Sequence, residues 1–352
     1  MRNERMTYAR QELNLAAMDA ARARWDGVAK PLRSLGLLED MIVQIAGIRS
    51  TADVCLNRRC VLVFCGDHGV VAEGVTQSAS DVTARVAEAI AHGNANVNLM
   101  AAACGADVFC VDMGMAADVP GVIARKSAPG TGNIAHGPAM TRAQAEQALQ
   151  AGMDLVGEMK KRGYDIIATG EMGIGNTTPT AALACALLGL DPEEMTGRGA
   201  GLSDAGLTRK LQTVRRALAI NQPLDSQLDI LAKLGGFEIA GLVGAFLGGM
   251  THGLPVIIDG VISAVAALLA ARICPEAKGY MLPSHMSREP AARHVMDALG
   301  LEPVIHAGLA LGEGTGAVML IPLLDMALRV YAGSHTFDSL GMDAYVDQGG
   351  KP

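Results

Sequence analysis

Short apolar runs recur along the middle of the chain. Four of them, near residues 61, 107, 165 and 255, read VLVFCG, DVFCVDMG, DIIATG and PVIIDG, and two weaker ones, GYMLPSH and EPVIHAG, lie near 279 and 302. A largely continuous apolar run predicts a strand that is covered on both faces. Longer helical patterns separate the runs, and this alternation predicts a parallel sheet with helices on both faces.

The segments between the runs carry helix end signals. Thr141 and Gln144 form a capping box at the start of one helical pattern, and Gly163 is placed to stop it. We expect the ligand-binding residues in the loops that directly follow the strands, because ligands bind beyond the carboxyl ends of parallel strands.

The two ends of the chain show helical patterns and no strand pattern. Residues 1–50 and 315–345 are both of this kind, and no repeat or low-complexity linker divides the chain. We therefore predict a small helical domain made of residues 1–50 with 322–352, beside a large α/β domain at 51–321.

Composition excludes several classes of protein. Half of the residues are hydrophobic and 18% are charged, so a large core can be buried and disorder is not expected. A net charge of −7 with one tryptophan argues against nucleic-acid binding. The N-terminus lacks the apolar core of a signal peptide, and the most apolar segment, 261–271, is interrupted by Arg272, well short of the ~20 residues that span a bilayer. We expect a cytoplasmic protein that does not bind membranes.

The cysteines and histidines show no metal-binding or redox motif. The seven cysteines contain no CxxC pair, and several lie within apolar runs, as buried reduced thiols do. The eight histidines contain no HExxH. We expect no metal and no cofactor.

The loop after the first predicted strand, FCGDHGVVAEGVTQSASDVT at 64–83, holds the first candidate residues. Asp67 and His68 are either a catalytic pair or part of a turn. Thr76 and Ser78 are placed to line a ligand pocket.

The loop after the third predicted strand reads GEMGIGNTTPT. Gly173, Gly175, Asn176, Thr177 and Thr178 precede a small-residue helix, and Pro179 suits its first turn. Backbone amides, hydroxyls and a helix N-terminus together form a phosphate cradle. The alternative is an ordinary capped turn between a strand and a helix.

Three further segments follow strands or glycines. Arg198 in GRGAG and Lys210 are either phosphate ligands or solvated surface charges. Asp259 either caps the helix that follows it or holds a ribose hydroxyl or a catalytic neighbour. The segment SHMSRE contributes His285, Ser287 and Glu289.

The segment LGEGTGA places an acid where a phosphate would otherwise be expected. A carboxylate repels a phosphate, so Glu313 is expected to face the other half of the substrate, where a proton must be removed. Glu171 poses the same question in GEMG. Two acids in glycine-rich loops indicate a reaction in which positive charge develops and a proton leaves, with one acid as general base and the other as electrostatic stabiliser.

The chain resembles the nicotinate-nucleotide:dimethylbenzimidazole phosphoribosyltransferases, which make the lower-ligand nucleotide of cobamides. The matching segments run from about residue 31 to 338 and include GDHGVVAEGVT, GEMGIGNTTPTAA, GRGAGL, GGFEIAGLVGAFL, VIIDGVISAVAAL, SHMSREP and LGEGTGA. The resemblance implies a Rossmann-like sheet, a small helical domain and a dimer. It also implies transfer of 5-phosphoribose from nicotinate mononucleotide to an aromatic base, with inversion of the β anomer to α.

The resemblance also implies roles for residues. Glu313 matches the general base, and Glu171 lies with the nucleotide-binding positions as the second catalytic acid. The remaining expected nucleotide contacts are the 173–178 loop, Lys210, Asp259, Ser287, Gly314 and Thr315. We expect the base pocket at Asp67, His68, Thr76, Val82 and Ala84.

The chain departs from the family pattern around the expected base pocket. Ala310 stands where the family usually has arginine, GRGAG replaces GRGTG, NANVN replaces GAAIN, and TQSASDVT lacks the usual proline. These changes leave the acceptor open between a benzimidazole and a phenol or p-cresol. They also leave open whether the chain is active alone, as a homodimer, or as the weaker subunit of a heterodimer with a homologous chain. A dinucleotide-dependent oxidoreductase is a third reading, but no G-x-G-x-x-G follows the first strand.

Overall fold

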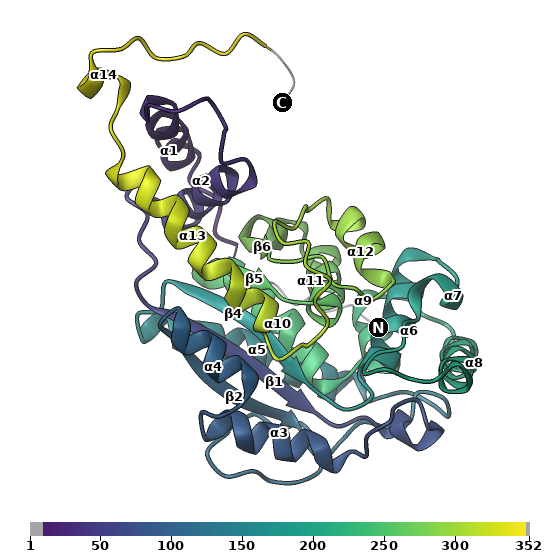
Figure 1. Ribbon diagram of the computed structural model, residues 1–352. Coiled ribbons are helices and arrows are strands. Elements are labelled where there is room, and N and C mark those ends of the chain that lie inside the picture. The colour runs from purple at the N-terminus through teal and green to yellow at the C-terminus, as the bar shows by residue number, and fades with distance from the viewer. Residues whose placement is uncertain (1–9, 350–352) are drawn as a thin grey trace.

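The fold is built around one parallel sheet. The structure is a computed structural model that describes residues 10–349. Its sheet has the order β3-β2-β1-β4-β5-β6, and all of its pairings are parallel (Figure 1). This is the strand order of a doubly wound Rossmann sheet. Strands β2 and β3 are added on one side of β1, and β4, β5 and β6 are then added on its other side. The strands are β1 Arg59–Gly66, β2 Ala106–Gly114, β3 Ile123–Ala124, β4 Ile166–Met172, β5 Val256–Ile258 and β6 Met281–Pro283.

Helices cover both faces, which confirms the predicted fold class. Each face has its own hydrophobic cluster, because the strands alternate their buried side chains between the two. One cluster joins the sheet to α1 Leu15–Gly27, α2 Leu37–Arg49, α3 Asp81–Ala91, α4 Asn96–Ala103 and α13 Thr315–Gly333. The other joins it to α5 Arg142–Lys161, α6 Thr177–Leu188, α7 Pro192–Met195, α8 Asp204–Ile220, α9 Gln227–Leu234, α10 Phe237–His252, α11 Val261–Ile273 and α12 Ala291–Leu299.

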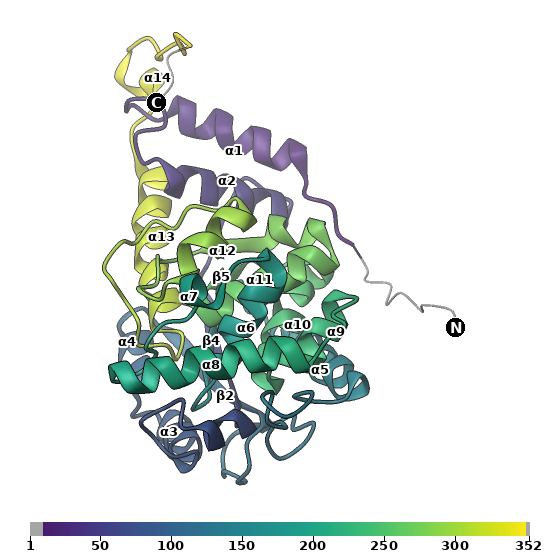
Figure 2. The same ribbon diagram turned by 90° about the vertical axis from the view of Figure 1, so that its right-hand side faces the viewer.

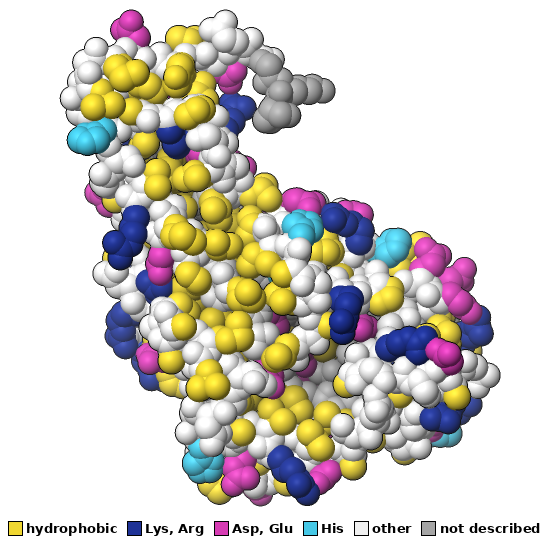
Figure 3. Space-filling view, viewed as in Figure 1, with side chains coloured by type: hydrophobic (Ala, Val, Ile, Leu, Met, Phe, Trp, Pro, Cys, Tyr) yellow, Lys and Arg dark blue, Asp and Glu magenta, His cyan; other side chains and the backbone are white. Residues whose placement is uncertain are grey.

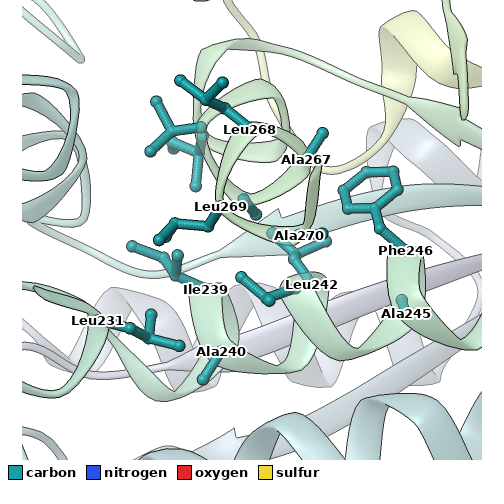
Figure 4. Close-up of a cluster of buried hydrophobic side chains, with 14 of the residues drawn as sticks. Leu231, Ile239, Ala240, Leu242, Ala245, Phe246, Ala267, Leu268, Leu269 and Ala270 are labelled. Atoms are coloured by element: carbon teal, nitrogen blue, oxygen red, sulfur yellow. The ribbon is translucent and has the colours of Figure 1, made fainter. Parts of the chain in front are cut away.

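Helix α10 is the centre of the second layer. Every residue from Phe237 to Met250 is buried, and α10 packs on α5, α11 and the sheet. Its apolar side chains interlock with those of α9 and α11 (Figure 4). The approach to α5 is very close, because a Cβ on Gly244 would overlap the carbonyl oxygen of Leu149. Glycine at this position therefore sets the spacing of the layer.

The two ends of the chain meet at one end of the molecule. Helices α1 and α2 lie beside the C-terminal half of α13, as both views show (Figures 1 and 2). The ring of Trp25 contacts that of Tyr331 at 4.9 Å between centroids, and Val28 forms a bridge with Thr336. The boundary predicted at 321/322 falls inside α13, and the division into two domains stays a prediction.

Most predicted elements are present, and the differences have local causes. The helix starting after Thr141 has the predicted capping box, and Gly163 follows it with a φ of 83°. The run near 302 is wrong as a strand: it makes one bridge, between His285 and Ile305. The sequence did not predict β3, because two residues are too short to show a pattern.

The N-terminal helical pattern is shorter than expected. Helix α1 begins at Leu15, since the Asn14 side chain accepts a hydrogen bond from the Ala17 N–H and so caps the helix there. The part of the prediction on residues 1–9 lies outside the described residues.

One described helix, α13, has the length and apolar composition to cross a membrane. The apolar segment 261–271 lies in α11, a helix of 13 residues that is too short for a membrane span. Core helices of globular proteins have the same properties, and α13 buries one side against β4, α2 and α4. Pro322 lies inside it without ending the helix.

Candidate active site

The candidate site lies where the sheet order reverses. The loops after β1 and β4 diverge there, and the loops after β5 and β6 reach the same edge. They surround an open cavity, and the space between them, which includes open solvent, is about 990 Å³. The surface view shows a hollow with acidic side chains inside it (Figure 3). The lining residues with polar or charged side chains are Thr76, Gln77, Glu171, Asn176, Thr177, Arg198, Ser263, His285, Ser287, Glu289 and Glu313.

Glu171 lies near the end of β4, on the cavity wall. Its side chain is buried, and the Asn176 amide donates a hydrogen bond to Oε2. The pKa of Glu171 is raised to about 8. Burial is the largest cause and the charges of Asp259, Glu238 and Glu313 add to it, while the hydrogen bond from Asn176 acts in the opposite direction. Without a bound cation, Glu171 is therefore largely protonated at neutral pH.

Glu313 lies on a left-handed turn. Its φ is 62°, between Gly312 at 83° and Gly314 at 90°, and its N–H donates to the Glu171 carbonyl at 3.2 Å. A non-glycine residue in this region costs about 1 kcal/mol or more, so the surrounding contacts must hold it there. One such contact is Gly170, where a Cβ would come within 2.5 Å of the Glu313 carbonyl oxygen.

The Glu313 carboxylate lies at the N-terminus of α4. Its Oε2 lies 3.4 Å from the Val97 N–H. Burial raises the pKa of Glu313, while Val97 and the Asn96 side chain lower it. A raised pKa brings this carboxyl nearer to the working range of a general base. Glu313 and Glu171 thus line one cavity and not two.

The 173–178 loop has the form expected of a phosphate cradle. Gly175 has a φ of 90°, and α6 begins at Thr177 with its N-terminus at the cavity. Thr178 is fully buried behind the lining. Backbone amides and the positive end of a helix favour an anion at such a place.

Lys210 supports this loop from behind. It is completely buried and does not line the cavity; its Nζ donates to Thr177 Oγ1 at 2.7 Å and to the Gly197 carbonyl at 3.0 Å. Burial lowers its pKa to about 8, which leaves it mostly charged at neutral pH. Lys210 therefore adds positive charge beneath the α6 N-terminus and fixes the Thr177 hydroxyl.

Asp259 caps a helix, but not the one that follows it in the chain. Its two carboxylate oxygens accept hydrogen bonds from the Gly314 N–H at 3.2 Å and the Ala317 N–H at 2.9 Å, so it caps α13. The cap on α11 that was one of the expected alternatives is wrong, since no side chain caps α11. Asp259 holds the turn that carries Glu313, and Thr315 closes that turn by donating from Oγ1 to the Gly312 carbonyl.

Asp67 and His68 lie behind the cavity wall, which differs from their expected place in the base pocket. His68 Nε2 lies 2.7 Å from Glu238 Oε1, and both side chains are buried. Asp67 Oδ2 accepts from the Ala116 N–H at 2.8 Å. A Cβ at Gly173 would come within 3.3 Å of His68 Nε2, so the His68–Glu238 pair supports the turn after β4.

Of the other expected base-pocket residues, Thr76 lines the cavity. Val82 and Ala84 are half-buried on α3 and outside the lining, and their assignment stays a prediction. Thr83 between them was not predicted: its Oγ1 accepts from the Ile174 N–H at 3.1 Å and ties α3 to the loop after β4. Ser287 lines the cavity as expected.

Two lining residues were missed because their signals are not local. The Gln77 amide donates to the carbonyls of Ala200 and Gly201 and so bridges two sides of the cavity mouth. Ser263 lies in an apolar helical run and lines the cavity from α11. Across residues 10–349, no three His, Cys, Asp or Glu side chains gather as metal ligands.

Comparison with known proteins agrees with this geometry. A family model described as "Phosphoribosyltransferase" matches residues 11–342. A nicotinate-nucleotide–dimethylbenzimidazole phosphoribosyltransferase from Ruminiclostridium cellulolyticum is 43% identical over 338 residues, 95% of this chain and 96% of the relative. One from Escherichia coli is 43% identical over 320 residues, 90% of this chain and 89% of the relative.

Solved structures give the same result. A crystal structure of CobT from Thermus thermophilus matches with a TM-score of 0.89 at 42% identity, over 94% of this chain and 100% of that chain. The parallel sheet, the cavity between the loops and these near full-length matches lead to one conclusion: the chain belongs to the nicotinate-nucleotide–dimethylbenzimidazole phosphoribosyltransferase family.

Proposed function

We propose that this chain transfers 5-phosphoribose from nicotinate mononucleotide to 5,6-dimethylbenzimidazole or a related aromatic base. The products are the α-ribotide 5′-phosphate and nicotinate, which serve cobamide synthesis. The observation that carries this proposal is the position of Glu313 and Glu171 in one cavity, beside the 173–178 loop. The names of the relatives support the same donor and acceptor.

The phosphate end of the nucleotide belongs at the α6 N-terminus. Gly173, Gly175, Asn176 and Thr177 line the cavity there, and Ser287 reaches it from the loop after β6. The buried ammonium of Lys210 adds positive charge from behind. This end of the cavity attracts an anion. Glu171 lies next to it, because its carboxylate accepts a hydrogen bond from the Asn176 amide, whereas the Glu313 carboxylate lies at the N-terminus of α4.

The acids suit the charges of the reacting centre. Nicotinate is attached to C1 of the ribose as a pyridinium, and when that C–N bond breaks its electrons go to the ring nitrogen, which becomes neutral. C1 acquires positive charge before the new bond forms. Glu171, once ionised beside the bound cation, stabilises that charge through the water-poor interior.

The acceptor attacks C1 from the opposite face and gives the α product. Its ring nitrogen forms the new bond to C1, and the proton on its other nitrogen is lost to the Glu313 carboxylate. The left-handed turn holds the Glu313 backbone at the cavity wall, which supports this assignment. The proton balance therefore closes within the site.

The acceptor wall is less polar than the family pattern predicts. Ala310 and Leu311 line the cavity beside Glu313, where the family usually has arginine at 310. A phenolic acceptor such as p-cresol, which offers one oxygen, is the second candidate that this wall accommodates. In that case Glu313 removes the phenolic proton.

We expect the active form to be a dimer in the cytoplasm. An apolar stripe runs along α4 and α13, with Leu99 67% and Met326 55% exposed, and it is visible in Figure 3. Exposed apolar surface of this kind marks a protein interface. The partner is a second copy of this chain or, as the alternative, a homologous subunit beside which this chain has the weaker activity.

The direct test is product formation by the purified chain. Nicotinate mononucleotide is incubated with dimethylbenzimidazole, other benzimidazoles, adenine, phenol and p-cresol, and ribotides are identified by mass spectrometry. Glu313→Gln is expected to reduce the rate by roughly 10²- to 10⁴-fold, which is typical of a positioned general base. The exposed Glu88 on α3 provides the matched control, Glu88→Gln, which is expected to keep full activity.

Each outcome separates the candidates. An α-ribotide of a benzimidazole supports the main proposal, and phenolic ribotides alone support the second candidate. No product with any acceptor, alone or with a homologous subunit, contradicts both. An unchanged rate for Glu313→Gln inside a heterodimer assigns the chemistry to the other subunit.

A further inference from the structure

His285 lines the cavity but has no part in the steps described above. It follows β6, and the neighbouring Met286 N–H donates to the Ile305 carbonyl at 2.9 Å, which fixes the backbone. The side chain is 3% exposed. A buried histidine in a substrate cavity needs partners for both ring nitrogens, and the two nitrogens of His285 differ in this respect.

The hydrogen on Nδ1 can be assigned from the neighbouring serine. Ser284 Oγ lies 2.6 Å from the Ile258 carbonyl oxygen and 3.1 Å from His285 Nδ1. A carbonyl only accepts, so the single hydroxyl hydrogen of Ser284 points to Ile258. Nδ1 must then be the donor to Ser284 Oγ, and in a neutral ring Nε2 is left with its lone pair.

The ring is held in place by the turn that carries Glu313. A Cβ on Gly316, in the first turn of α13, would overlap the imidazole ring, so His285 packs directly on that backbone. The charge of Asp259 acts on His285, but the carboxylate oxygens of Asp259 accept hydrogen bonds from backbone N–H groups of α13. Within residues 10–349, the hydrogen bond of this ring is at Nδ1, and no protein group is hydrogen-bonded to Nε2.

We propose that His285 Nε2 accepts a hydrogen bond from a ribose hydroxyl of the bound nucleotide. This assignment rests on the function proposed above. A nitrogen lone pair repels phosphate oxygens and attracts O–H donors, and the ribose is the part of the nucleotide that carries free hydroxyls. His285 lines the same cavity as Ser263, Ser287, the two acids and the 173–178 loop, and the sugar that joins the phosphate to the reacting C1 must lie in that cavity.

Burial keeps this nitrogen available as an acceptor. It lowers the pKa of His285, which favours the neutral ring at neutral pH, although the charge of Asp259 acts in the opposite direction. The same residue thereby distinguishes a ribonucleotide from a deoxyribonucleotide. His285 is a specificity-determining contact and not a proton-transfer group.

The test compares nicotinate mononucleotide with its 2′-deoxy and 3′-deoxy analogues. For the wild-type protein, one analogue is expected to show a kcat/KM about three- to tenfold lower than the parent, the usual effect of one hydrogen bond. In His285→Leu this difference is expected to disappear. His285→Gln, whose amide oxygen can accept, is expected to retain part of it. His92→Leu, at an exposed histidine directly after α3, is the control.

A second measurement reads the ring directly. Nitrogen-15 NMR of labelled protein, with the signal assigned by its loss in His285→Gln, is expected to show a hydrogen on Nδ1 and none on Nε2. This reading needs no turnover and does not depend on the stability of the leucine variant. Ser284→Ala is expected to weaken the preference for this tautomer.

The outcomes test the proposed function and the role of His285 separately. If the wild-type protein does not use nicotinate mononucleotide, the proposed function fails and the ribose contact falls with it. If it does use the nucleotide and His285→Leu keeps the full discrimination, only the role of His285 is overturned. A hydrogen found on Nε2 also overturns it, because the nitrogen then has no lone pair to offer.

Discussion

At the scale of single residues, the site combines an acid that burial makes weak with an acid held on a strained turn. Glu171 is buried at the end of a strand, and its pKa is raised to about 8. Such a group is well matched to a cationic substrate, because a pyridinium beside it favours the ionised form. In the ligand-free protein, ionisation of the buried Glu171 side chain is unfavourable and lowers the free energy of unfolding.

That cost predicts a change in stability with pH. A raised pKa means that the contribution of Glu171 to stability is fully present below its ordinary value of 4.5 and is lost as pH rises through about 8. Glu171→Gln removes this loss. We compare the free energy of unfolding of the variant with that of the wild type at pH 4.5 and at pH 9. The difference in favour of the variant is expected to be larger at pH 9 by roughly 1 to 4 kcal/mol.

Urea unfolding of the ligand-free protein at the two pH values measures this effect. Activity of the same variant is expected to fall, since a neutral amide cannot stabilise the charge at C1. Glu88→Gln on the exposed face of α3 is the control and is expected to show no such gain. An equal stability change at both pH values would contradict the account of Glu171.

A second residue-scale prediction concerns Asn96, at the start of α4. This position is alanine in the family segment GAAIN, and here the Asn96 side chain lowers the pKa of Glu313. Asn96→Ala is therefore expected to raise that pKa further. The base form then appears only at higher pH, so the ascending limb of kcat/KM against pH is expected to move upward.

The pH profile of the forward reaction gives the measurement. Asn94→Ala, two residues earlier and also exposed, is the matched control and is expected to leave the profile unchanged. If both variants share the wild-type limb, Asn96 does not act on Glu313. Asn96 is one of the positions at which the segment NANVN departs from GAAIN.

At the scale of elements, close glycine contacts decide how the layers approach each other. Helices α5 and α10 meet backbone to backbone, with Gly152 facing the Gly241 carbonyl and Gly244 facing the Leu149 carbonyl. Gly170 in β4 and Gly314 before α13 make a similar close contact. It brings the strand that carries Glu171 against the turn that carries Glu313.

Gly244→Ala tests this packing. The added methyl would overlap the Leu149 carbonyl, so α10 must move away from α5, and overpacking of this kind costs about 1 to 3 kcal/mol or more. Gly333→Ala, in open space at the end of α13, is the control and is expected to stay within about 0.5 kcal/mol of the wild type. Denaturant unfolding compares the two. Equal stability of the two variants would mean that the helices tolerate a wider spacing.

At the scale of the whole molecule, the apolar stripe on α4 and α13 lies on the outer face of the sheet layer that supports Glu313. Leu99→Asp places a charge in the middle of that stripe, where it would have to be buried on association. We expect the wild-type chain to have twice the 36.4 kDa mass of one chain in solution, and Leu99→Asp to be a monomer.

Light scattering after size-exclusion chromatography measures the mass. Ile220→Asp, at the exposed end of α8, is the control and is expected to remain a dimer. A dimeric Leu99→Asp would place the interface elsewhere. A monomeric wild type would contradict the homodimer and favour a homologous subunit as the partner that covers the stripe.

Much of this organisation could be predicted from local patterns. The long strands, the capping box at Thr141, the turn around Gly175 and the position of both acids after strands or glycines all follow from residues close together in the chain. Periodicity and end signals act over a few residues, and this is why they survive in the sequence. Elements with only two or three residues, such as β3, leave no such signal.

The partners of the site residues were decided by tertiary structure. Asp259 caps a helix 58 residues away, and His68 pairs with Glu238 across 170 residues, so neither partner is visible in a local motif. The free nitrogen of His285 likewise depends on Ser284, Ile258 and Gly316 meeting at one place. By itself the sequence determined the class of fold and the kind of chemistry, because both depend on short segments. Only the folded chain decided which side chains face the substrate and which hold others in position, because packing brings those distant segments together.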